Sequence, residues 1–233
     1  MDTGNDASIT NDEEYYLNHV VFLVENTRFK VPTQRFEEES EVFKSMFTLP
    51  PGSDLSSEGQ TDEHPIRLDG VLKKDFKALL RVLYPKKFGT RLELSTDEWV
   101  CVLHLSTKWA IDSVRTFAID TLYRALKGSP HKLVIYGKRF DVDDWIFIGV
   151  ELLVRRATPM TDEDVTQLGI GEVLRISAIR ECYSYMTLLP ERGEKPRDGS
   201  LDTRIQTVYE LADVPDWHSR PSARIPAGRI ILN

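Results

Sequence analysis

The chain has 233 residues, of which 41% are apolar and 29% charged, which is enough for one large or two small domains with a real core. No apolar run approaches the roughly 18–20 residues of a membrane span, and two cysteines, Cys101 and Cys182, indicate a reducing, intracellular setting rather than a disulfide scaffold. The first 14 residues include five acidic and no basic residues, so that the other 219 residues carry only −2 of the net charge of −7. A body this close to neutral argues against a nucleic-acid-binding surface.

Residues 1–14 are polar and acidic and show no hydrophobic periodicity. We therefore expect a disordered acidic leader, which serves either as an interaction tail or as a solvated end. The first residues are not basic and no apolar stretch follows them, so they do not resemble a secretory signal.

Two short strands are predicted next. Residues 20–24 are all apolar and rich in β-branched side chains, as in a strand that is covered on both faces. Asn26 is expected at the turn because Asn tolerates a left-handed backbone. Residues 28–31 alternate polar and apolar, and Pro32 ends this second strand because it lacks an N–H for the ladder.

One helix is predicted from Thr33 to residue 47, because its apolar positions recur at helical spacing. Its expected buried stripe is Phe36, Ser40, Phe43, Met46 and Phe47. Residues 48–65 are rich in Pro, Gly, Ser and acidic side chains, and form either a functional loop or a tolerated insertion. Residues 66–69 are expected to form a third short strand that ends at Gly70.

Three more helices follow, at residues 72–84, 95–109 and 112–125. The second of these opens with a capping box, in which Ser95 and Glu98 each satisfy a free backbone N–H. An isolated hairpin is not stable, so these helices must cover it. The predicted fold class is therefore α+β and mostly helical, with a short three-stranded sheet flanked by helices over residues 15–127.

The remaining chain is predicted as a helical extension, residues 128–189, packed on the first part, and a Pro-rich tail, residues 190–233, with one short helix capped by Ser200. Asp141 is expected to cap a helix that is apolar nearly all round and lies in this chain's core or under a partner. Further helices are expected at 161–168 and 172–187. The tail is either a loose terminus or an arm that docks through Trp217 and residues 230–232.

No pattern in the sequence predicts a catalytic, cofactor-binding or metal site. There is no phosphate loop and no zinc-type spacing of Cys and His. The acidic runs at residues 37–39 and 143–144 stand where helix starts favour negative charge, and Cys101 is expected to be an inert core thiol. The five histidines are scattered without ligand spacing: His19, His64, His104, His131 and His218. The basic doublets are expected to be solvated: Lys73-Lys74, Lys86-Lys87 and Arg155-Arg156.

The order of these elements over about residues 15–125 resembles the BTB/POZ domain family. The resemblance rests on Val20–Val24, Phe29–Pro32, Phe36, Ser40, Phe43, Met46-Phe47, Phe76, Leu79-Leu80 and Leu83-Tyr84, followed by a pair of helices. It continues through Lys132-Leu133, Gly137–Val142, Trp145 and Leu153–Arg156, which are similar to the extended BTB proteins of mushroom-forming (basidiomycete) fungi.

The resemblance implies a non-enzymatic protein–protein interaction module that is often a homodimer, works as a scaffold or adaptor in the cytoplasm or nucleus, and binds no cofactor. Its partners would be proteins, including a second copy, and neither nucleic acid nor membrane. One family role is substrate adaptor for a cullin-type ubiquitin ligase, in which a hydrophobic residue two positions before a Glu helps to grip the cullin. Here Leu55 precedes Glu58 by three positions, and Asn18-His19 stands where many members have an acidic residue. The remote alternative is an enzyme on an unfamiliar α+β scaffold.

Overall fold

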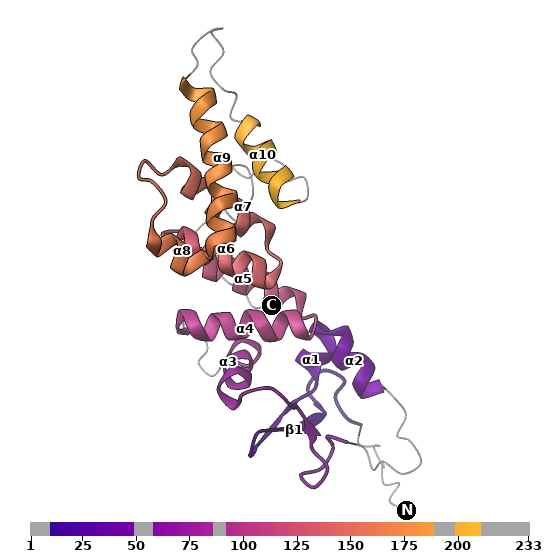
Figure 1. Cartoon of the computed structure of the whole chain (residues 1–233). Coiled ribbons are helices and arrows are strands. Elements are labelled where there is room, and N and C mark those ends of the chain that lie inside the picture. Colours follow the sequence, from indigo (N-terminus) through magenta and orange to yellow (C-terminus); the bar gives the residue numbers. More distant parts are fainter. Residues whose placement is uncertain (1–9, 49–57, 86–91, 189–198, 211–233) are drawn as a thin grey trace, which may run out of the picture. The chain divides into compact units, whose positions relative to one another are not determined.

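The structure is a computed structural model that describes residues 10–48, 58–85, 92–188 and 199–210. Figure 1 shows a small sheet and helices that form two compact units, residues 1–118 and 119–233, divided within α5. The first unit holds β1 His19–Val24, β2 Thr27–Pro32, α1 Gln34–Glu39, α2 Glu41–Thr48, β3 Ile66–Arg67, α3 Lys73–Leu83 and α4 Thr96–Lys108. Helix α5 spans Asp112–Leu126, and the second unit continues with α6 Pro130–Phe140, α7 Asp143–Arg155, α8 Asp162–Leu168, α9 Ile170–Leu188 and α10 Gly199–Tyr209.

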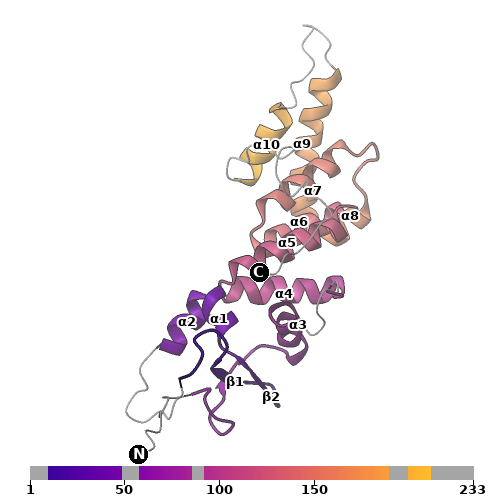
Figure 2. The same ribbon diagram turned by 180° about the vertical axis from the view of Figure 1, so that it is seen from behind.

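The sheet has three strands in the order β2-β1-β3, and the predicted α+β, mostly helical fold class is confirmed. β1 and β2, both labelled in Figure 2, run antiparallel with Phe22 opposite Phe29. β3 lies parallel to β1 with Ile66 opposite Phe22. The sequence predicted a left-handed backbone at Asn26. In the structure, the residue of this two-residue turn that has a positive φ is Glu25 (52°). The Glu25 carboxylate accepts a hydrogen bond from the backbone N–H of Lys73 at 3.0 Å, so this turn also caps α3.

The core of the first unit is built around Phe22, which is fully buried. Its ring centroid lies 5.3 Å from that of Phe36, 5.8 Å from that of Phe43 and 5.4 Å from that of Phe76, in tilted or edge-on contacts. Trp109 at the end of α4 extends this cluster toward Phe43 at 5.3 Å. Aromatic side chains from a strand and from three helices therefore hold the sheet to its covering helices.

The single helix expected from Thr33 to residue 47 is wrong, because the chain breaks at Ser40 into α1 and α2. Ser40 has an extended backbone (φ −142°, ψ 114°) and forms a β-bridge with Ile111. Its buried hydroxyl donates a hydrogen bond to the Trp109 carbonyl at 2.6 Å and accepts one from the Phe43 N–H at 3.3 Å. A buried pairing with a distant residue thus outweighs the continuous helical pattern of the sequence.

We expect Ser40→Ala to lower the free energy of unfolding by about 1–3 kcal/mol, because the Trp109 carbonyl would lose its buried donor. The measurement is urea unfolding followed by circular dichroism. Ser45→Ala, on the exposed face of α2, is the matched control and should change little. An equal effect of the two substitutions would contradict this role of Ser40.

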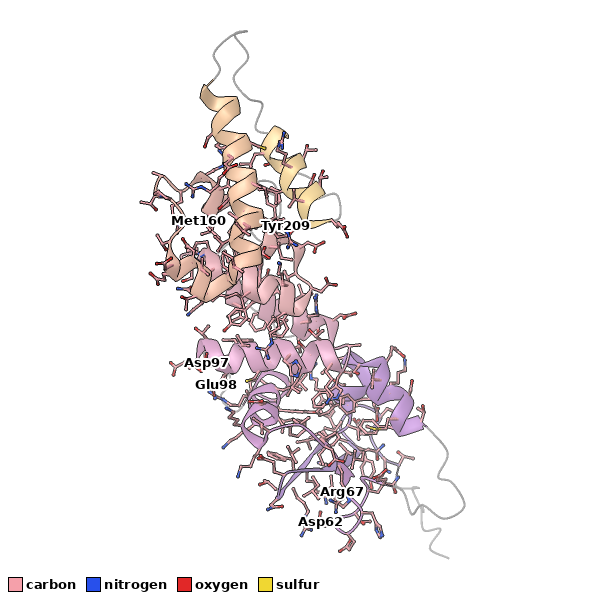
Figure 3. The ribbon with its side chains drawn as sticks, in the orientation of Figure 1. Asp62, Arg67, Asp97, Glu98, Met160 and Tyr209 are labelled. Carbon is pink, nitrogen blue, oxygen red and sulfur yellow. The ribbon has the colours of Figure 1, made fainter. Side chains whose placement is uncertain are left out.

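Helices α3 and α4 form as the sequence predicts. The expected stripe of α3 buries Phe76, Leu79 and Leu83, and the capping box at the start of α4 is present, with Ser95 and Glu98 exchanging hydrogen bonds. Figure 3 labels Glu98 at this helix start. The hydrogen bond from the Ser95 N–H, together with Arg81 at 2.8 Å, lowers the pKa of Glu98.

The second unit has a core of its own in which α7 is the central helix. The predicted apolar side chains of α7 are mostly buried there, against α6, α9 and α10, although Leu152 is exposed. Gly137 and Gly149 permit the close approach of α6 and α7: a Cβ at Gly149 would lie 2.8 Å from the Pro130 carbonyl oxygen. The core side chains are Val134, Ile146, Phe147, Val150, Leu153, Val154, Ile176, Ile179, Leu201 and Ile205.

Pro130 occupies the first turn of α6, where its missing N–H is not needed. Two local expectations for this unit are wrong. Asp141 does not begin α7; it ends α6 with a left-handed backbone (φ 55°), and Val142 precedes α7. Ser200 lies inside α10 instead of capping it. Leu55, Trp217, His218 and residues 230–232 lie outside the described residues.

Candidate protein-interaction surface

A tight turn at residues 12–16 exposes two tyrosines next to the first strand. The Asp12 carboxylate accepts hydrogen bonds from the N–H groups of Glu14 and Tyr15, and its carbonyl accepts one from Tyr16. Tyr15 and Tyr16 are 77% and 66% exposed. Residues 10–14, expected in the disordered leader, thus include the beginning of this turn.

The C-terminal end of this segment is attached to the sheet. The Asn18 carbonyl accepts a hydrogen bond from the N–H of Thr33, which follows β2. Leu17 and, on α2, Val42 are further exposed apolar side chains of the same unit. Contiguous exposed apolar surface, as at the consecutive residues Tyr15, Tyr16 and Leu17, is typical of protein-interaction sites. The sequence interpretation missed this surface, although the pair Tyr15-Tyr16 was its signal.

The second unit contains a buried carboxylate, Asp164, that the sequence did not single out. Arg156 donates two hydrogen bonds to it, at 3.0 and 2.6 Å, and the Thr161 N–H donates a third at 2.6 Å. The His131 Nε2 lies 2.5 Å from the same carboxylate. Hydrogen bonding by the Arg156 guanidinium, above all, holds the pKa of Asp164 well below its usual range.

The contact of His131 and Asp164 has a structural explanation. It joins the first turn of α6 to α8, and the Thr161 hydroxyl is engaged in the capping box of α8. Arg156 also donates a hydrogen bond to the Pro159 carbonyl at 2.9 Å, which ties the α7–α8 connection to the same cluster. We therefore interpret these side chains as a support for the helical packing.

The buried carboxylate of Glu172 forms a second cluster with Lys138, Arg175 and Tyr209, which are partly exposed. The Tyr209 hydroxyl donates a hydrogen bond to Glu172 at 2.5 Å, while Lys138 and Arg175 lie over the tyrosine ring. Burial is the largest cause that raises the pKa of Tyr209, which stays protonated. Figure 3 labels Tyr209 on α10, and the cluster holds this helix to α6 and α9. In the part of the chain that is described, no group of three or more His, Cys, Asp or Glu could hold a metal ion.

The remaining candidate groups do not come together. Glu37 lies in the first turn of α1, and Asp143 and Asp144 lie in the first turn of α7. The helix dipole favours negative charge at these positions. His19 and His104 are exposed. A hollow of about 130 Å³ beside Glu25 and Arg67 is much smaller than the roughly 300 Å³ of typical ligand pockets. Within the described ranges, no helix is both long and apolar enough to cross a bilayer.

We expect Cys101 to react very slowly with thiol reagents at pH 8 in the folded chain. Burial, followed by the neighbouring Asp75 carboxyl, raises its pKa to about 11, so only about one molecule in a thousand carries the thiolate. In a Cys182→Ser background, the modification rate should be about 100-fold below that of the urea-unfolded chain. Similar rates in the two states would show that the thiol is accessible and ionised.

The comparison with protein families agrees with these observations. Residues 11–125, just under half of the chain, match the family of the BTB/POZ domain, which is generally a module of protein–protein interaction. The three-stranded sheet flanked by helices in this range is consistent with that fold. No curated protein matches the chain.

Proposed function

We propose that the chain is a non-enzymatic protein-interaction module that associates with itself through the exposed side chains near its N-terminus. BTB/POZ domains are generally modules of protein–protein interaction. The observation that carries the proposal is the exposure of Tyr15, Tyr16 and Leu17 on a segment that is ordered by Asp12 and anchored through Asn18. An ordered apolar segment loses little conformational freedom when a partner covers it.

The test is multi-angle light scattering of the full chain at micromolar concentrations, where we expect a dimer or a larger species. Tyr15→Ser/Tyr16→Ser/Leu17→Ser should weaken association at least about tenfold, since aromatic anchors carry much of the energy of an interface. The matched control is Ile170→Ser/Leu174→Ser, which removes two exposed apolar side chains from α9 in the other unit. A wild-type chain that stays monomeric would refute self-association, as would equal losses in the two variants.

The alternative role is adaptor for a cullin-type ubiquitin ligase. Glu58 is exposed, while Leu55 lies outside the described residues. Leu55 precedes Glu58 by three positions, whereas the family spacing is two. A pull-down with a cullin N-terminal domain separates the roles: robust binding would favour the adaptor, and its absence the plain scaffold.

The prediction that residues 128–189 extend the BTB/POZ domain, as in the fungal extended BTB proteins, is supported by the separate core of the second unit. An intracellular setting is supported by the two cysteines, which are free thiols. The remote alternative is an enzyme on an unfamiliar α+β scaffold. The proposal of a non-enzymatic module is supported over it by the candidate reactive groups of the described residues, which lie apart from one another.

A further inference from the structure

The outer face of α3 is strongly basic. Lys73, Lys77 and Arg81 follow one another at intervals of four residues, and Lys74 lies between them on the same side, opposite the buried stripe. We refer to Lys73, Lys74, Lys77 and Arg81 as the basic face. The three lysines are exposed, whereas Arg81 is paired with Glu98. From Lys73 to Arg91 the sequence has seven basic residues and one acidic residue.

Neither packing nor helix stability explains the basic face. Like charges four residues apart destabilise a helix, and positive charge in the first turn opposes the helix dipole. Within the described ranges, Lys73, Lys74 and Lys77 take part in no ion pair closer than 4.0 Å. An exposed cluster of unpaired positive charges attracts a negatively charged partner.

The turn at residues 12–16 has the complementary composition. Asp12, Glu13 and Glu14 precede the exposed Tyr15 and Tyr16, and the first 14 residues hold five acidic and no basic side chains. We refer to residues 12–16 as the acidic turn. The basic face has a matching apolar neighbour, Leu72, which is 47% exposed at the start of α3. Charge and apolar surface therefore stand side by side on both elements.

The acidic turn and the start of α3, with Leu72, Lys73 and Lys74, lie at opposite ends of β1. The turn leads into Asn18, directly before β1, whereas α3 begins at Lys73, whose N–H binds Glu25, directly after β1. A six-residue strand is about 20 Å long. Helix α3 runs back from this end, because Tyr84, directly after α3, donates a hydrogen bond to the carbonyl of Pro32, which pairs with His19 at the start of β1. The described turn is therefore held away from Leu72, Lys73 and Lys74 of its own chain, which favours a contact of these residues with a second chain.

We propose that the basic face of α3 binds the acidic turn of a second copy of this chain, with Tyr15 or Tyr16 packed on Leu72. The identity of the partner rests on the proposed self-association, and the site on α3 is new. The contact joins two different surfaces and is therefore heterologous. Two chains that exchange their turns form a closed dimer, and chains that do not exchange them form larger assemblies. Association through it weakens as salt rises, because both sides are exposed to solvent.

The binding site is tested with a fluorescein-labelled peptide of residues 1–17, titrated with the full chain at low salt. We expect binding that weakens at least about tenfold in Lys73→Glu/Lys74→Glu/Lys77→Glu. This variant should fold, because acidic residues suit the first turn of a helix. The matched control, Lys30→Glu/Lys44→Glu/Arg67→Glu, makes the same change in net charge elsewhere on the unit and should bind the peptide more tightly than the α3 variant.

The contact between chains is tested by charge exchange in the full-length protein. Glu13→Lys/Glu14→Lys, which keeps the Asp12 carboxylate that orders the turn, and the α3 variant should each lose salt-sensitive association in light scattering, and a mixture of the two should regain it. Recovery on mixing supports a contact between copies, and failure to recover overturns it. A peptide that does not bind, or binds both charge variants equally, overturns the α3 site even if the chain self-associates. A monomeric chain whose α3 still binds the peptide refutes self-association and the contact between copies, and leaves only the binding site on α3.

Discussion

Phe22→Ala is expected to lower the free energy of unfolding by about 3–5 kcal/mol, which is a large part of the stability of a typical domain. Phe22 is fully buried and contacts the rings of Phe36, Phe43 and Phe76. Its removal would leave a cavity between the sheet and three helices, because these elements cannot all move inward together. Urea unfolding followed by circular dichroism measures the loss.

Two control substitutions separate the cavity from a general loss of apolar surface. Phe22→Leu keeps most of the volume and should cost clearly less than Phe22→Ala. Phe47→Ala removes a half-buried ring at the edge of the cluster, 5.9 Å from Phe43, and should also cost less. If Phe47→Ala were as damaging as Phe22→Ala, the core of the first unit would not be centred on β1.

Asp164→Asn is expected to lower the free energy of unfolding by about 3 kcal/mol, because it leaves the charge of Arg156 without its buried partner. The expected site of the change is the second unit, where hydrogen exchange should accelerate in α7 and α8. Asp162→Asn, in the exposed first turn of the same helix, is the matched control and should cost only about 0.5 kcal/mol. Adding Arg156→Met to Asp164→Asn should recover part of the loss, since the unpaired charge is then absent.

The same substitution predicts a pH dependence with a definite sign. The pKa of Asp164 in the folded chain is depressed, so its contribution is present above the unfolded value of about 4 and is lost as the pH falls below that value. The difference in unfolding free energy between wild type and Asp164→Asn should therefore shrink from pH 7 to pH 3. A difference that stays constant over this range would show that the Asp164 carboxylate does not stabilise the fold by its charge.

Much of the fold was predictable because its determinants are local. Alternation of apolar residues in β2, the helical spacing of Phe76, Leu79 and Leu83, and the capping box at Ser95 each depend on neighbours a few residues away. The order of such elements was sufficient to predict a resemblance to the BTB/POZ domain, and residues 11–125 match that family. Local errors arose where two patterns compete, as at Asn26 and Asp141, since the left-handed residue of the turn is Glu25 and Asp141 ends a helix.

By itself the sequence determined the strands of the hairpin, the buried faces of most helices and the class of domain, because backbone preference and hydrophobic period act over short distances. Only the tertiary structure decided the break at Ser40, which depends on Ile111 and Trp109 about 70 positions further on. It also decided the cluster of Asp164, His131 and Arg156, which come from three different elements. Such contacts depend on how distant segments meet in space, and no local pattern of residues specifies that meeting.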